Sequence, residues 1–215
     1  MPHRFAELAF TPTVKAAQER HGSRESYARF AARSPANDRL GPQEVAFLAE
    51  RDSFYMATVS ETGWPYVQHR GGPPGFVRVL DDRTIAFADF RGNRQYVSVG
   101  NLSGDDRVAL IFVDYPHQAR LKILGRARLV GVDDDPALLD RLALSGYDAR
   151  VERAMVITLE AFDWNCPQHI TPRYTEAEIA RAVAPLRARL AELEAEVARL
   201  RPLAGATSGS LDAKE

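Results

Sequence analysis

The feature that most constrains this chain is a series of short segments with high β propensity that follow one another between residues 53 and 162. Turn-forming residues separate these segments, as at Asp81-Asp82 and Pro116-His117. Many short strands at this spacing favour a barrel or a sandwich. We expect the strands to be Phe54–Val59, Tyr66–Arg70, Gly75–Leu80, Thr84–Ala88, Arg107–Asp114, Ala119–Val132 and Val151–Phe162.

Helices are expected before the first strand and at two places between later strands. Thr11-Pro12 can open a helix that runs to His21, and further helices are expected at Ser23–Ala32 and from Gly41-Pro42 to Arg51. The segments Asn93–Asn101 and Asp135–Leu144 interrupt the strands with helical patterns. Together these segments predict an α+β domain, mainly β, built on an antiparallel barrel.

The last forty residues follow a heptad pattern. Pro185 would kink a helix or form its first turn, so the secure part of the helix is Leu186–Leu200. Such a helix either packs on its own domain or pairs with another chain. Its apolar residues recur at spacings of four and three: Ile179, Val183, Leu186, Leu190, Leu193, Val197 and Leu200.

These changes of pattern divide the chain into four expected parts. Residues 1–50 form an N-terminal helical extension, and residues 51–164 form the barrel. Residues 165–204 contain a loop and the long C-terminal helix, and residues 205–215 are expected to be a disordered tail. A chain of 215 residues can bury a core without disulfides or a structural metal.

The composition excludes several classes of protein. No apolar run approaches the roughly 18 residues of a membrane-spanning helix, and the first residues lack the pattern of a secretory signal. The single cysteine, Cys166, excludes an intramolecular disulfide, and His169 has no partners at metal-ligand spacing. A formal net charge of -1 argues against nonspecific binding of nucleic acid. We therefore expect a cytoplasmic protein that has no metal site, does not span a membrane and does not bind nucleic acid.

The near-zero net charge conceals a local excess of positive charge. Glutamate is absent from residues 62–151, and residues 64–130 carry nine arginines and one lysine against six aspartates. Arginine suits phosphate and carboxylate groups, although a codon bias would also give a chain whose basic residues are mostly arginine. The excess therefore indicates either an anion site among the strands or strand faces that carry charge without a function.

Two stretches contain groups that favour an anion. His69–Phe76 joins two strands and offers glycine backbone N–H groups beside a histidine and an arginine. Its glycines and prolines also match a simple turn. Asp89–Arg94 joins a strand to a helix and offers a glycine and two arginines beside the N–H groups that begin the helix, although Asn93 is equally suited to a simple N-cap. Neither stretch matches the phosphate-loop or dinucleotide glycine patterns, so ATPase and Rossmann functions have no support.

Seven short motifs follow one another in order between Leu40 and Trp164. They are Phe54-Tyr55-Met56-Ala57-Thr58-Val59, Gly63-Trp64-Pro65, Arg70-Gly71-Gly72 with Gly75-Phe76, Asp89 with Gly92-Asn93-Arg94, Asn101-Leu102, Val108–Phe112, and Arg120-Leu121-Lys122 with Gly125-Arg126-Ala127. This succession resembles the FMN-binding split barrels of the pyridoxamine 5'-phosphate oxidase-like superfamily. The resemblance implies a six-stranded antiparallel Greek-key split barrel and a homodimer with FMN in a cleft between the subunits.

The resemblance also implies which residues bind the cofactor. Asn93 stands where the oxidases have a basic residue, a loss that Arg70 or Arg91 offsets, and Arg120 stands where they have a glutamine near the flavin. A cation there would stabilise a reduced, anionic flavin. The implied cofactor-binding residues are Gln68, His69, Arg70, Gly71, Phe87, Ala88, Asp89, Arg91, Gly92, Asn93, Arg94 and Arg120.

The segment after the last strand, Trp164–His169, departs from the vitamin B6 oxidases, whose substrate motif it lacks. The resemblance therefore implies a flavoprotein relative rather than a pyridoxamine 5'-phosphate oxidase. We expect an FMN-dependent oxidoreductase that acts on a small substrate by hydride transfer, with no catalytic residue assigned. The alternative is a non-catalytic protein that binds flavin, F420 or haem and serves as a carrier, sensor or partner-docking module. Cys166 is either a small buried residue or a reactive thiol.

Overall fold

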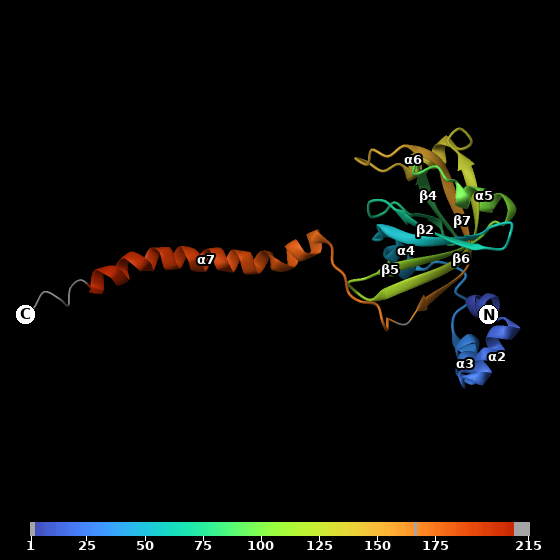
Figure 1. Ribbon diagram of the computed structural model, residues 1–215, viewed down its shortest axis with the longest axis horizontal. Coiled ribbons are helices and arrows are strands. Elements are labelled where there is room, and N and C mark those ends of the chain that lie inside the picture. Colours follow the sequence, from blue (N-terminus) through green and yellow to red (C-terminus); the bar gives the residue numbers. More distant parts are fainter. Residues whose placement is uncertain (1–2, 166, 209–215) are drawn as a thin grey trace, which may run out of the picture. The chain divides into compact units, whose positions relative to one another are not determined.

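The computed structural model describes residues 3–165 and 167–208 and divides the chain between Thr171 and Pro172 into two compact units. Figure 1 shows a curved sheet with short helices in the first unit and one long helix in the second. Cys166 and residues 209–215 of the expected tail lie outside the described residues.

All strands of the first unit belong to one antiparallel sheet of seven strands in the order β2-β1-β5-β6-β7-β4-β3. The six-strand count implied by the family resemblance is wrong for this sheet, because the short strand β3 pairs with the outer edge of β4. The residue pattern alone had predicted seven strands. Their bounds are β1 Ser53–Val59, β2 Pro65–Gly71, β3 Arg78–Asp81, β4 Thr84–Phe90, β5 Arg107–Asp114, β6 Ala119–Gly131 and β7 Val151–Asn165.

Seven helices occur within the described residues, so the fold is mixed α+β with a long C-terminal helix. The short helix α1 was not expected, and the long helix continues through Pro185 and on to Ser208, beyond the start of the expected tail at residue 205. None of these helices has the length and apolar character that a membrane span requires. Their bounds are α1 Arg4–Ala9, α2 Pro12–Arg20, α3 Arg24–Arg33, α4 Pro42–Ala49, α5 Val97–Gly104, α6 Pro136–Leu142 and α7 Glu176–Ser208.

A cluster of phenylalanines shows how strongly the sheet curves. Strand alternation turns Phe54 of β1 toward the interior, where it is 1% exposed and its ring centroid lies 4.6 Å from that of Phe112 on β5. The same ring lies 5.3 Å from that of Phe87 on β4, although three strands separate β1 from β4 in the sheet. The sheet therefore curls until the inner faces of β1 and β4 meet across one core (Figure 1).

Because Phe54 joins both sides of this core, its truncation should be costly. We expect Phe54→Ala to lower the free energy of unfolding by about 3–5 kcal/mol through lost burial and the cavity left behind. Trp64→Ala removes an aromatic side chain that is 76% exposed and serves as the matched control, with little expected change. Urea unfolding followed by circular dichroism measures both variants, and equal stability of the two would contradict this view of the core.

Candidate functional site

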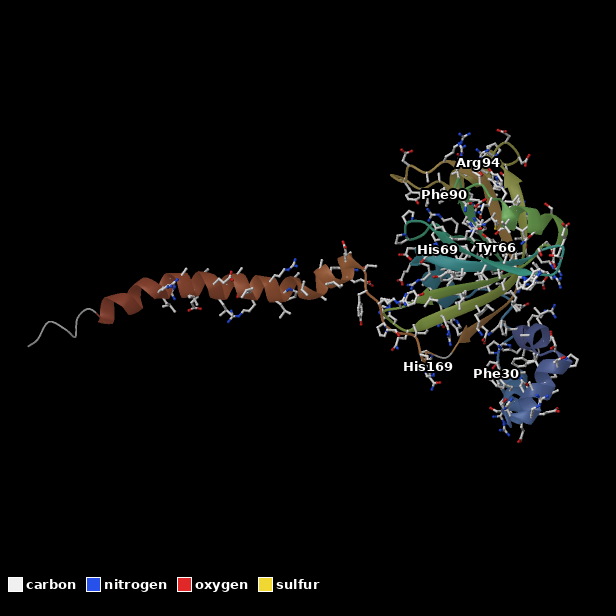
Figure 2. The ribbon with its side chains drawn as sticks, in the orientation of Figure 1. Phe30, Tyr66, His69, Phe90, Arg94 and His169 are labelled. Atoms are coloured by element: carbon white, nitrogen blue, oxygen red, sulfur yellow. The ribbon has the colours of Figure 1, made fainter. Side chains whose placement is uncertain are left out.

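Two adjoining cavities lie where the C-terminal ends of β2 and β4 approach the start of α5. One has a volume of about 220 Å³ and the other of about 50 Å³, and they share five lining residues: Gln68, Arg70, Asp89, Phe90 and Gly92. We call the two together the β2–β4 cleft. Figure 2 labels three residues of its lining, His69, Phe90 and Arg94. Eleven of the twelve residues implied as cofactor-binding line this cleft, and Arg120 is the exception.

An ion pair joins the two strands that form the cleft. Alternation along β2 places Gln68 and Arg70 on the inner face, and the Arg70 guanidinium donates to Asp89 Oδ1 on β4 at 2.7 Å. Only 13% of the Arg70 side chain and 9% of the Asp89 side chain are exposed. Since β2 and β4 share no backbone pairing in the sheet, this contact links strands that the hydrogen-bond ladder leaves apart.

The Asp89 carboxylate is held in a partly desolvated environment. Burial raises its pKa above the ordinary value, and the nearby charges of Arg70 and Arg153 only partly oppose that effect. Arg153 on β7 approaches Asp89 Oδ2 at 3.8 Å, because the register of the sheet sets Arg153 opposite Asp89. The Nε of Arg70 is buried and has no hydrogen-bond partner among the described residues, so one donor in the cleft is unused.

A second group of charges lies at the mouth of the cleft. Arg94 Nε donates to the Tyr96 hydroxyl at 3.3 Å, and that hydroxyl donates to Glu152 Oε1 at 3.2 Å. Arg91 Nε lies 3.9 Å from the same carboxylate oxygen. Arg91 and Arg94 are both exposed, so a ligand at the mouth can reach their guanidinium groups.

The backbone before α5 is irregular, which corrects the expected helix start. Arg94 and Tyr96 have positive φ values of 62° and 54°, so the helix begins at Val97 rather than Asn93. Tyr96 is the N-cap residue, and Asn93 instead accepts a hydrogen bond from Gln95 N at 3.1 Å. No described side chain caps α5, so its first N–H groups lack a side-chain acceptor, and Val97, Ser98 and Val99 line the smaller cavity.

A residue of α5 holds the Gln68 side chain in the cleft. Ser98, which is buried, donates its hydroxyl to Gln68 Oε1 at 3.1 Å. This hydrogen bond sets the orientation of the Gln68 side chain and ties the helix to β2. A methyl group added at Gly92 would meet nothing within 4 Å, so the chain leaves open space at this edge of the cleft.

Arg120 lies away from the other implied residues. On β6 it is paired with Val113 of β5 and Asn165 of β7, and both β5 and β1 separate it from β2. Alternation places Arg120 on the outer face of the sheet, opposite the buried Leu121. His69, although it borders the cleft, also belongs to the outer face, where its ring lies 5.5 Å from that of Tyr55.

Eight residues that line the cleft are absent from the implied set: Phe76, Phe90, Tyr96, Val97, Ser98, Val99, Tyr147 and Glu152. Arg153, which approaches Asp89 from β7, is also absent from it. Tyr96 and Ser98 lie two and four residues after Arg94, so the position of the helix start in the sequence was the signal that could have found them. Glu152 and Arg153 lie about sixty residues downstream of Asp89 in the chain, so only the pairing of β4 with β7 brings them in.

Replacing Arg70 by methionine should destabilise the fold in a pH-dependent manner. At neutral pH the variant leaves a buried carboxylate with a poorer partner, and we expect a loss of about 3 kcal/mol in unfolding free energy. Without Arg70 the pKa of Asp89 rises further, so protonation on acidification relieves the loss. The deficit relative to the unchanged protein therefore shrinks as pH falls from about 7 toward about 4.

Urea unfolding at several pH values measures this effect. The matched control is Arg39→Met, which breaks an exposed Arg–Asp pair with Asp82 at 2.6 Å and should change stability little at any pH. A deficit for Arg70→Met that stays constant from neutral to acidic pH would show that Asp89 does not carry it.

The sequence of this chain matches the model of one protein family. A family model described as pyridoxamine 5'-phosphate oxidase matches residues 40–162. No curated protein sequence matches the chain.

Solved structures align with this chain at low sequence identity and with TM-scores below 0.5. HupZ of Group A Streptococcus has a TM-score of 0.44 at 16% identity, over 63% of this chain and 100% of that chain. A pyridoxamine 5'-phosphate oxidase homologue of Lactobacillus delbrueckii has a TM-score of 0.44 at 21% identity, over 59% and 94%. An FMN-binding protein of Syntrophomonas wolfei has a TM-score of 0.40 at 13% identity, over 69% and 97%. Because the family model spans more than half of the 215 residues, the chain belongs to the pyridoxamine 5'-phosphate oxidase family.

Proposed function

We propose that this protein is an FMN-dependent oxidoreductase that binds the phosphate of FMN in the β2–β4 cleft and acts on a small substrate. The observation that carries the proposal is the gathering of eleven implied cofactor residues around one cleft. Four arginines surround that cleft, Arg70, Arg91, Arg94 and Arg153, against the two carboxylates of Asp89 and Glu152. The balance of charge favours an anionic ligand.

The cleft has donors suited to a phosphate group. The uncapped N-terminus of α5 offers backbone N–H groups and the positive end of a helix dipole. Arg91 and Arg94 flank it, and Gly92 leaves room for an oxygen to approach the backbone. The buried Nε of Arg70 supplies a further donor that no described residue uses. These residues therefore fit a phosphorylated flavin.

The residues deeper in the cleft would hold the rest of the cofactor. When bound, FMN supplies the capacity to accept or donate a hydride. Gln68, fixed by Ser98, offers amide groups for hydrogen bonds to a heterocycle. Phe87 forms an apolar wall beside the Arg70 guanidinium, whose Cζ lies 6.0 Å from the ring centroid. One polar edge and one apolar wall would orient a planar ring and keep water away from it.

We interpret the curled sheet as the split barrel of the family. The strands from β2 to β4 would form the barrel wall, and β3 would extend the sheet beyond it. The Arg70–Asp89 pair supports this interpretation because it joins the first and sixth strands of the sheet order.

We also propose that the protein is a homodimer with the flavin at the subunit interface. The outer face of the sheet is apolar around Tyr55, Val67, Ile111 and Leu124, which line a third cavity, and Val67 is 60% exposed. An antiparallel sheet that faces water normally carries polar residues on that face, so this patch favours a partner.

The size of the cleft supports the same arrangement. Cofactor sites commonly enclose about 300–1,000 Å³. The larger cavity of the cleft has about 220 Å³, which would enclose only part of a cofactor, and a second copy would complete the site. His69 and Arg120 share the outer face of the sheet, and a dimer formed through that face would bring Arg120 toward a flavin held at the interface.

Arg94→Ala should weaken FMN binding roughly ten- to a hundredfold, because it removes a charge-assisted contact with the phosphate. Titration of the flavin-free protein with FMN, followed by quenching of flavin fluorescence, measures the affinity. Arg29→Ala removes an exposed arginine of α3 and is the matched control, with unchanged affinity expected. If Arg94→Ala also left the affinity unchanged, the phosphate would have to bind elsewhere.

Val67→Asp should separate the subunits and weaken FMN binding, because it places a charge on the apolar outer face. The chain ending at Arg173 is used, so that only the sheet unit can associate. Analytical ultracentrifugation gives the mass, and we expect a dimer for the unchanged sheet unit and a monomer for the variant. Val14→Asp, at an exposed position of α2, is the control. A monomeric mass for the unchanged unit would exclude a dimer formed by the sheet.

A further inference from the structure

Helix α7 carries an apolar seam from Ile179 to Leu200 that is largely exposed. It opens with a capping box, in which Thr175 Oγ1 accepts from Glu178 N at 3.2 Å and Thr175 N donates to the Glu178 carboxylate at 2.7 Å. Six of the seven seam residues are between 43% and 70% exposed, and Val183 is half-buried. A helix that leaves such a stripe in water gains little from it, so the stripe indicates a partner.

The residue types along the seam specify the kind of partner. In heptad notation Val183, Leu190 and Val197 occupy a positions, and the d positions are Ile179, Leu186, Leu193 and Leu200. β-Branched residues at a with leucine at d favour two parallel strands over three or four. Two of the three a positions are valine, and three of the four d positions are leucine. The seam therefore has the composition of a parallel dimer.

The charges beside the seam are complementary between two copies of the same helix. The g positions Arg189 and Glu196 each precede, by five residues, an e position of opposite charge. In a parallel, in-register pair, Arg189 faces Glu194 of the second copy and Glu196 faces Arg201 of the second copy. Each pairing occurs twice by symmetry. Within one helix Arg189 pairs with Glu192 at 2.9 Å and Glu196 with Arg199 at 3.5 Å, and these exposed i, i+3 pairs can exchange for the contacts with the second copy.

Pro185 does not obstruct this pairing. It occupies a c position, which points away from the seam, and α7 continues through it. The seam from Ile179 to Leu200 spans about three heptads, the lower limit for a stable coiled coil. A contact between the sheet units of the same two copies would strengthen the pairing by raising the effective concentration of the helices, but the pairing does not require it.

We propose that α7 pairs with α7 of a second copy of this chain as a parallel, in-register, two-stranded coiled coil. The pairing requires no flavin and no contact between α7 and the sheet unit. It adds a second, independent link between subunits, which keeps them together when the protein is dilute.

Disulfide trapping in the full-length chain tests the proposal. In a Cys166→Ser background, Leu186→Cys places a thiol at a d position, where two parallel in-register helices bring the pair within bonding distance. Ala188→Cys places the same thiol at an outward f position and is the matched control. We expect at least about tenfold more disulfide-linked dimer from Leu186→Cys than from Ala188→Cys after mild oxidation.

Charged substitutions in the Leu186→Cys chain show whether the seam itself drives the linkage. Leu193→Asp should abolish the disulfide-linked dimer, and Ala195→Asp, at an f position, should leave it unchanged. Circular dichroism of each variant confirms that the helix is retained. Each measurement is made with and without added FMN, so a failure of flavin binding does not affect the result.

Three outcomes would overturn the proposal. Equal linkage of Leu186→Cys and Ala188→Cys would show chance collision between tethered helices. Absence of linkage from Leu186→Cys, with efficient linkage between mixed Leu186→Cys and Val197→Cys chains, would show an antiparallel pair. Absence of linkage in every variant would show that the seam binds something other than a second copy.

Discussion

A buried ion pair between Arg70 and Asp89 joins two strands that exchange no backbone hydrogen bonds. The curl of the sheet brings β2 and β4 together around the phenylalanine core, and the ion pair fixes that approach at the end where the cleft opens. Removing two charges from water is costly, so the pair is maintained only because the sheet, Arg153 and the packed core hold both partners in place. The cleft lies beside this ion pair, where β2 and β4 approach each other.

The Arg70–Asp89 pair also affects the charge that the cleft presents to a ligand. Asp89 neutralises part of the positive charge inside the cleft, and its raised pKa reflects the cost of burying a carboxylate there. Arg91 and Arg94 sit farther out, where solvent reaches them, beside a helix start that no described side chain caps. Arg70 is thus held by Asp89 inside the cleft with only its Nε unpaired among the described residues, whereas the exposed Arg91 and Arg94 can turn toward a ligand at the mouth. The overall charge of -1 conceals this local arrangement.

Local sequence signals predicted all seven strands. β1, β2, β5 and β6 alternate inner and outer residues, whereas β4 is a short apolar run buried on both faces, and turn residues separate the strands. The same signals placed the start of α5 four residues early, since Arg94 and Tyr96 adopt a left-handed backbone that side-chain preferences do not reveal. The implied six-strand count failed at β3, a four-residue edge strand. Arg70, Asp89 and Arg94, which the family resemblance grouped as cofactor residues, line one cavity. Glu152 and Arg153 depend on the β4–β7 register, which no local pattern encodes. The seam of α7 could be predicted because the spacing of its apolar residues is a property of the sequence and does not depend on tertiary contacts.

The central claim is that the β2–β4 cleft holds the phosphate of a flavin mononucleotide. Native mass spectrometry of the purified protein, followed by identification of the small molecule released on denaturation, tests it most directly. The account predicts one FMN for each chain, recovered intact after denaturation and rebound when added back to the emptied protein. Release of F420 or haem in its place, or protein that stays free of flavin after incubation with FMN, would contradict it.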